Sequence, residues 1–533
     1  MGTSQSSRTE ALTDTDSPAE KSVWKGVAAI VVVWLALWGL GFPLAMFDDL
    51  YYIGAALNLV QGHGYVNSYT PAIEIFGVGD KFFCYLPLHS YVLMGWLSLM
   101  GVSRMAFTFF QCACGMVACA GLWKLLRTGS GDMRLALAIC LCVMIFLGGL
   151  GLRPDGLGLA FLAWGLHLPR MKSAWCWFLC AVALFASVFT CPNYGVLALL
   201  TIAIAFYRQA RMDPEWRRKL PSRIALMLVA FALSFMLFLL MINFEFSAFA
   251  SAFQAAREMA SRTALAGRMA MLAADPPVLV RLVFHSGQPI VTLLCGLALG
   301  GLVVGIGTVM FLLLGRKQVD GVTAARTESS FFQRYFDEKL DPAILVGLLL
   351  TSVLLYGPAL FSASGQRVPA LYLALVILFL VRHLRPRFQM VGWLGWAGYV
   401  VLFFLSSGYE TMQLLAIPFC PSRGAPMKLQ DEVAALNPAY VYLDEFALDA
   451  VYDYRLPAGA KDIHFSLPSW PVSVRPEDFP SGSVLVISRQ TAYTMGLRDE
   501  RSRYVPLPLS GLAWLFPNQS GNPYDCVIVP VTK

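Results

Sequence analysis

The chain has 533 residues, of which 57% are hydrophobic and only 14% are charged. A soluble domain of average composition carries about a quarter charged residues, so this composition excludes an ordinary soluble globular protein. The net charge of +7 does not indicate a nucleic-acid partner, because the basic residues are spread between apolar runs instead of forming one patch. We therefore expect membrane lipid to surround much of the chain.

Hydropathy divides the chain into three parts. Residues 1–22 are rich in Ser, Thr, Asp and Glu, which predicts a short disordered cytoplasmic leader. Residues 23–408 consist mostly of apolar runs of 17 or more residues separated by short charged connectors. A helix of that length spans the roughly 30 Å hydrocarbon core of a bilayer. Residues 409–533 mix polar and apolar sequence with many prolines, which indicates a separate soluble α/β domain. Strands are expected at 439–443, 483–488 and 525–529, and a helix at 445–454.

The apolar runs predict a polytopic helical membrane protein with about eleven transmembrane helices. These helices are expected near residues 23–46, 105–126, 133–152, 155–169, 173–190, 192–209, 221–243, 288–314, 341–361, 365–381 and 390–408. The first run is too long for the apolar region of a signal peptide, and no small-residue cleavage site follows it. The run at residues 86–100 is short, and we expect it to lie along the outer surface. If it crossed the membrane, every later basic cluster would change sides.

Basic residues gather in five clusters, and together they predict the orientation. The clusters are 124–134, 170–172, 208–223, 316–339 and 382–387. The positive-inside bias places all five in the cytoplasm together with the N-terminus. The C-terminal domain is then periplasmic or extracellular, and the protein belongs in the inner (plasma) membrane. Two long loops, 47–104 and 244–287, lie on the same outer side. Because the helix interiors carry almost no ionisable residues, we expect any chemistry at the outer membrane surface.

The first outer loop begins with two acids and an amphipathic segment. Apolar residues recur at helical spacing at Leu50, Ile53, Leu57 and Val60, which predicts a helix lying on the membrane interface. One Asp before such a helix is an ordinary N-cap. The Asp48–Asp49 pair supplies a second carboxylate that capping does not need.

Four motifs follow one another along the first half of the chain. They are Asp48-Asp49-x-Tyr-Tyr, Ala-x-Asn-Leu-x-x-Gly-His-Gly-Tyr at 56–65, aromatic-Leu-Pro-Leu at 85–88, and Gly-Leu-Arg-Pro-Asp-Gly-Leu at 151–157. In this order they resemble membrane glycosyltransferases of the GT-C fold. The resemblance is closest to the branch of lipid A aminoarabinose transferases, protein O-mannosyltransferases and arabinofuranosyltransferases. It covers residues 23–210 in motif and the remainder, including the terminal α/β domain, only in architecture.

The resemblance implies that a sugar passes from a polyprenyl phosphate donor to a lipid or cell-envelope glycan acceptor, such as lipopolysaccharide, at the periplasmic face. It implies no cofactor and no metal. The implied catalytic residues are Asp48 or Asp49 as general base and Asp155, which would orient Arg153 or the acceptor. The residues expected at the donor phosphate are Lys81, Tyr85, Arg153 and Arg367. The residues expected at the acceptor are Glu74 and, in the second outer loop, Arg262 and Arg268. These two arginines have a second interpretation, as part of an amphipathic surface helix beside anionic lipid headgroups.

The chain departs from the aminoarabinose branch at one point. That branch has an acidic residue and a Lys before the Pro of the third motif, where this chain has Cys84 and Tyr85. Lys81, a few residues earlier, is the expected substitute for the lost lysine. Arg153 also has a purely structural interpretation, as a basic residue at the membrane interface.

Two other functions compete with this interpretation. A ligase or polymerase of lipid-linked glycans would favour Arg and His over paired Asp at the outer face. A flippase or transporter would carry polar residues near the middle of its helices, and these runs have almost none.

Overall fold

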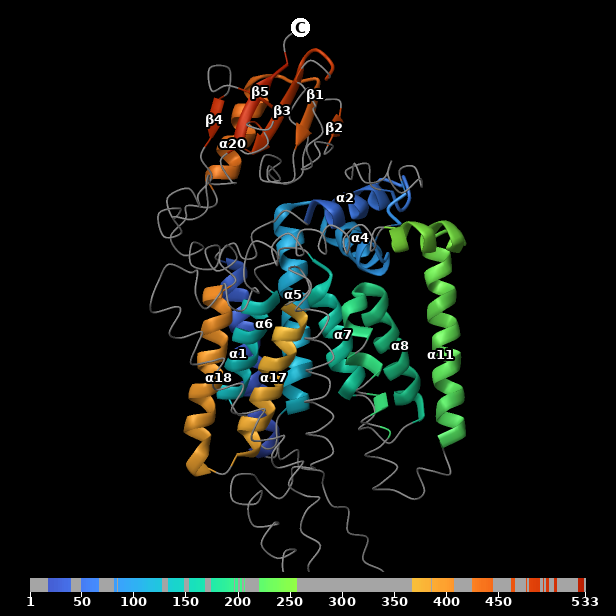
Figure 1. Cartoon of the computed structure of the whole chain (residues 1–533), viewed down its shortest axis with the longest axis vertical. Helices are drawn as coiled ribbons and strands as arrows, with labels where there is room; N and C mark the ends of the chain where they lie inside the picture. Colours follow the sequence, from blue (N-terminus) through green and yellow to red (C-terminus); the bar gives the residue numbers. More distant parts are fainter. Residues whose placement is uncertain are drawn as a thin grey trace, which may run out of the picture.

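The computed structural model describes the chain in segments. They are residues 18–39, 49–66, 81–83, 85–126, 133–147, 153–167, 174–195, 197–199, 202–203, 206, 220–255, 367–384, 386–406, 424–443, 462–464, 476, 479–488, 492, 495–497, 503–505 and 526–531. These segments are mostly helical, and they form a bundle of roughly aligned helices, two short helices across one end of the bundle, and a small C-terminal sheet (Figure 1).

The aligned helices of the bundle occupy the predicted apolar runs. They are α1 (Pro18–Gly39), α5 (Arg104–Leu126), α6 (Met133–Leu147), α7 (Asp155–His167), α8 (Ala174–Thr190), α11 (Leu220–Met241), α17 (Arg367–His383) and α18 (Pro386–Ser406). By length and composition, α5 and α11 are long and apolar enough to cross a membrane. Shorter apolar helical stretches occur in α1, α6, α8 and α17. The predicted helices 288–314 and 341–361 lie outside the described residues.

The first helix begins earlier than the sequence indicated. α1 starts at Pro18, inside the stretch 1–22 that was expected to be disordered, so that expectation was wrong for its last five residues. Proline is favoured at the first position of a helix, and Ala, Glu and Lys follow it, all good helix formers. Residues 1–17 lie outside the described part.

Side-chain contacts fix the direction of each neighbouring helix. α1 and α5 are antiparallel: a Cβ added to Gly115 would lie 2.5 Å from the ring of Trp34, whereas one added to Gly26 would meet Trp123 at the other end. Only glycine allows these indole rings to lie against the facing backbone. α7 runs parallel to α5, since a Cβ added to Gly156 would meet Gln111 near the start of both helices, and one added to Gly121 would meet Ala163 near their ends.

Two further contacts show how α8 and α11 are oriented. Phe185 contacts Phe231 at a centroid distance of 4.7 Å, and Phe189 stacks on Phe238 at 5.2 Å. The two helices therefore run in the same direction. Only a few residues of the predicted helix 192–209 are described, so that helix stays a prediction.

The basic clusters within the described helices gather at one end of the bundle. The last turns of α5 and α17 and the starts of α6 and α11 are at this end, and Phe146 stacks on Tyr399 toward the other. The described residues of the clusters, Lys124, Arg134, Arg223 and Arg382, therefore lie at the same end as the N-terminus of α1. Clusters 170–172 and 316–339 and most of 208–223 lie outside the described residues.

The opposite end is covered by α2 (Asp49–Val60) and α4 (Leu88–Met100), and we call it the α4 end (Figure 1). Tyr91 Oη donates a hydrogen bond of 2.8 Å to the carbonyl of Met241, where α11 ends. Trp96 Nε1 donates one of 2.9 Å to the carbonyl of Ala106, where α5 begins. Because α4 touches the same end of both helices, it lies across the bundle and does not run through it. This is the arrangement predicted for residues 86–100.

α2 packs on α4 with the predicted apolar face. Ile53 and Ala56 are fully buried in the contact, and the helix ends before two glycines in the left-handed region, Gly62 (φ 81°) and Gly64 (φ 89°). The backbone N–H of His63 closes the last turn on the carbonyl of Asn58. Only glycine adopts such positive φ angles without cost, so the Gly-His-Gly motif ends the helix.

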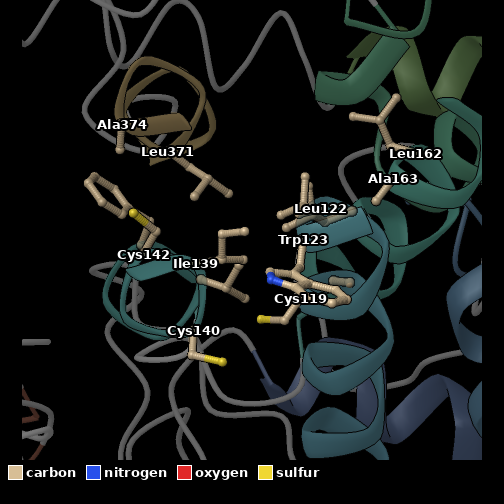
Figure 2. Close-up of a cluster of buried hydrophobic side chains, with 14 of the residues drawn as sticks. Cys119, Leu122, Trp123, Ile139, Cys140, Cys142, Leu162, Ala163, Leu371 and Ala374 are labelled. Carbon is tan, nitrogen blue, oxygen red and sulfur yellow. The ribbon is translucent and has the colours of Figure 1, made fainter. Parts of the chain in front are cut away.

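The core of the bundle is apolar and rich in cysteine. Cys119, Cys140 and Cys142 lie among Ile139, Leu122, Leu371 and Ala374, between α5, α6 and α17 (Figure 2). These thiols are free and buried, so they act as small apolar packing residues.

The C-terminal part contains α20 (Gly424–Ala435) and a five-stranded sheet. Its strands are β1 (Tyr440–Leu443), β2 (Asp462–His464), β3 (Ser483–Ser488), β4 (Arg503–Val505) and β5 (Cys526–Pro530), in the order β2-β1-β3-β5-β4. β1 pairs in parallel with β2 and β3, and β5 is antiparallel to β3 and β4. The predicted strands are β1, β3 and β5. β2, β4 and α20 were not predicted, and the helix predicted at 445–454 lies outside the described residues.

Candidate functional site at the α4 end

Arg153 and Asp155 form an ion pair where α7 begins. Arg153 Nε lies 3.4 Å from Asp155 Oδ2, and the Asp155 side chain is 11% exposed. Asp155 is the first residue of α7, where the helix dipole stabilises a carboxylate. The structure thus brings together two residues that the sequence had placed at one site.

Both carboxylate oxygens of Asp155 are engaged. The Cys191 thiol donates a hydrogen bond of 3.5 Å to Oδ1, while Oδ2 faces Arg153. The Tyr194 hydroxyl donates one of 3.1 Å to the backbone carbonyl of Asp155. A carboxylate held in this way is suited to fixing the direction of Arg153.

Sequence reasoning missed the residues that hold Asp155. Cys191 and Tyr194 belong to the turn after α8, whose short helix is η3 (Pro192–Tyr194). A Cβ on Gly158 would lie 2.8 Å from the ring of Tyr194, so the glycine one turn into α7 makes room for that ring. The Cys-Pro turn between two apolar runs was the available signal.

Lys81 forms a second ion pair, with Glu245. Its ammonium group also lies 5.7 Å from the centre of the Phe83 ring. The backbone of Lys81 is held by an antiparallel β-bridge to Val66. Glu245 follows α11 and was not predicted. The available signal was its position as the one ionisable residue in the stretch 224–256.

Tyr85, expected at the donor phosphate, belongs to a row of aromatic rings. Its ring lies 5.2 Å from that of Tyr52 and 5.0 Å from that of Phe82. The Tyr65 hydroxyl donates a hydrogen bond of 3.0 Å to the carbonyl of Tyr85. Tyr85 is partly exposed, so this row joins α2 to the loop that carries Lys81 and leaves one edge of the ring accessible.

His89 lies deeper, where α2 meets α4 and α5. Its ring packs edge-on against Tyr52 at 5.4 Å and Phe110 at 5.8 Å. It is fully buried, and within the described part of the chain neither ring nitrogen has a hydrogen-bond partner. Burial lowers the pKa of His89 to about 3, because a charged imidazolium cannot be solvated there. His89 is therefore a neutral packing residue.

The remaining predicted site residues are less fully described. Asp49 and Arg367 are the first residues of α2 and α17, and only their backbone is described. Both helix starts lie at the α4 end. Asp48, Glu74, Arg262 and Arg268 lie outside the described residues. The proposed base and the proposed acceptor contacts thus remain predictions.

Among the described residues, no group of three or more His, Cys, Asp or Glu side chains is placed to hold a metal ion. Comparison of the chain with protein-family models, curated proteins and solved structures found no match.

Proposed function

We propose that this chain is an integral-membrane glycosyltransferase that moves a sugar from a polyprenyl phosphate donor to a lipid or cell-envelope glycan acceptor. The observation that carries the proposal is the gathering of charge at one end of an apolar bundle. Lys81–Glu245 and Arg153–Asp155 both lie at the α4 end, under two helices that lie across it. An amphiphilic donor would present its phosphate and sugar at such a place while its tail stays in lipid.

The membrane architecture is part of the proposal. About eleven crossings would place the α4 end and the C-terminal sheet on the outer side. Support comes from the described basic residues Lys124, Arg134, Arg223 and Arg382, which lie at the end opposite the α4 end, and from the positive-inside bias.

The reaction needs a base and at least one cation. The acceptor hydroxyl oxygen attacks the anomeric carbon of the sugar, and the bond from that carbon to the donor phosphate oxygen breaks. The hydroxyl proton passes to a carboxylate, for which Asp48 or Asp49 at the start of α2 is the candidate. The polyprenyl phosphate leaves with the bonding electron pair. Arg153 and Lys81 are the cations that stabilise charge developing on its oxygens.

Asp155 supports this chemistry indirectly. Because its two oxygens face Arg153 and Cys191, it holds the guanidinium group in one direction before substrate arrives. A preorganised cation stabilises the transition state without reorganising during the reaction.

Lipids that copurify with the protein test the donor class. The protein should be purified in a mild detergent and its bound lipids identified by mass spectrometry. Enrichment of polyprenyl phosphate, or of its sugar ester, over the bulk membrane extract is expected. A lipid content identical to that of an unrelated membrane protein from the same cells would count against the proposal.

A further inference from the structure

We infer that Glu245 is a placeholder carboxylate, which occupies Lys81 while the donor site is empty and is displaced by the phosphate of a polyprenyl phosphate. The inference rests on the proposed function and adds a residue that the sequence motifs do not include. It begins from the ion pair that joins residues 164 positions apart.

Glu245 is the one charged side chain in an apolar stretch, and its partner is Lys81. No other ionisable residue occurs in the stretch 224–256, which includes most of α11. Several large apolar side chains near it, such as Phe244 and Phe246, are exposed and suit a lipid environment. A lone carboxylate gains nothing from such surroundings, so Lys81 accounts for its presence.

The backbone that carries Glu245 is tightly fixed. Asn243 (φ 54°) and Phe244 (φ 60°) are successive non-glycine residues in the left-handed region. The N–H of Phe244 closes this corner on the carbonyl of Leu239 at 2.7 Å. Two such residues in a row are uncommon and persist only where the surroundings hold them. This turn therefore fixes the backbone position from which the Glu245 side chain extends toward Lys81.

The two segments also contact each other without the ion pair. The ring of Phe83, two residues after Lys81, lies 5.6 Å from that of Phe249. Phe249 in turn contacts Phe238 of α11 at 5.1 Å. Because these buried rings keep the loop docked on α11, breaking the ion pair moves side chains and leaves the backbone in place.

Both partners are accessible enough to exchange. The side chains of Lys81 and Glu245 are 38% and 37% exposed, so a ligand phosphate can reach the ammonium group and the released carboxylate can turn to water. An ammonium group binds a phosphate oxygen by the same charge-assisted hydrogen bond that it makes to a carboxylate. The carboxylate and the phosphate thus compete for one cation, and the return of Glu245 assists release of the polyprenyl phosphate product.

The inference predicts that removing the competitor tightens phosphate binding. Partly exposed ion pairs are closed only about one to five times as often as they are open. Only molecules in which the Lys81 ammonium group is free can bind the phosphate, and the ion pair lowers the fraction of such molecules. Glu245→Gln should therefore strengthen phosphate binding about two- to sixfold.

The test is binding of farnesyl phosphate to the full-length protein in detergent, measured by calorimetry, with farnesol as the uncharged control ligand. Glu245→Gln should bind farnesyl phosphate more tightly than wild type and farnesol equally. The gain should vanish when Lys81→Gln is present as well, since the two residues then share no cation. Asp431→Asn, which removes an exposed acid from α20, is the matched control and should leave binding unchanged.

The outcomes separate the two proposals. If wild type binds farnesyl phosphate and Glu245→Gln binds it no more tightly, the placeholder role is wrong and the proposed function stands. An equal gain in the Lys81→Gln background also overturns the placeholder role. The tighter binding would then come from removing a negative charge near the phosphate and not from freeing Lys81. If no variant binds farnesyl phosphate better than farnesol, both the donor class and the placeholder role are wrong. If Glu245→Gln does not fold, Glu245→Ala in the folded fraction must show the same gain, or the inference fails.

Discussion

Arg153 Nε lies 3.4 Å from Oδ2 of Asp155, and the other oxygen of this carboxylate accepts a hydrogen bond from the Cys191 thiol. A structural and a catalytic role for this pair predict different results. Asp155→Asn should destabilise the protein by about 1–3 kcal/mol, because it leaves a largely buried guanidinium with a weaker partner. The unfolding temperature in detergent measures this cost.

Catalysis provides the second readout for Arg153. Arg153→Lys keeps the charge but loses the fixed direction of the guanidinium group, so transfer from the donor should fall well beyond any change in unfolding temperature. If Arg153→Lys and Arg153→Gln both transfer sugar at the wild-type rate, Arg153 is only an interfacial anchor.

His89 should make the stability of the protein depend on pH. Its pKa is about 3 in the folded protein and about 6.5 when the chain is unfolded, so the unfolded state binds one more proton between these values. The contribution of His89 is therefore fully present above pH 6.5 and is lost as the pH falls toward 3, by about 1.4 kcal/mol per pH unit. Unfolding midpoints between pH 7.5 and 5 measure it.

His89→Phe removes the titrating group and should flatten part of that pH dependence. His63→Phe, at an exposed position after α2, is the matched control and should leave that pH dependence unchanged. Equal slopes for wild type and His89→Phe would show that His89 is not the group responsible.

Gly115 should not tolerate a side chain. A Cβ there would lie 2.5 Å from the buried ring of Trp34, and overpacking of this kind costs about 1–3 kcal/mol. Gly115→Ala should therefore lower the unfolding temperature. Gly95→Ala in α4, where nothing lies within 4 Å of the added atom, should be neutral or slightly stabilising. Equal effects of the two substitutions would contradict the close packing of α1 on α5.

The membrane orientation can be tested with reporter fusions. A reporter that is active only outside the cytoplasm should be active after Lys533 and silent at Gln318, which lies in a basic cluster. A silent fusion after Lys533 would reverse the proposed topology.

Local patterns predicted much of the fold. The spacing of Leu50, Ile53 and Leu57 predicted α2, and the short run at residues 86–100 predicted a helix along the outer surface that does not cross with the others. Short stretches rich in β-branched and aromatic residues predicted β1, β3 and β5. The strands β2 and β4 have only three residues each and owe their conformation to their neighbours in the sheet, so no local pattern marks them.

The candidate site was less predictable, because most of its contacts join segments that are far apart in the chain. Arg153 and Asp155 are two residues apart, and a motif can place them together. Glu245 meets Lys81 across 164 residues, and Cys191 meets Asp155 across 36. Such pairings follow from helix packing, which depends on contacts between distant segments. The spacing of nearby residues does not predict them.

Sugar transfer by Asp48→Asn and Asp49→Asn tests the central claim most directly. Asn keeps the size and part of the capping ability of Asp but cannot accept the acceptor's proton. Purified wild type should release polyprenyl phosphate from its sugar ester in the presence of acceptor. One of the two variants should do so about 10²–10⁴-fold more slowly while keeping its unfolding temperature. Near wild-type turnover by both single variants would contradict the account.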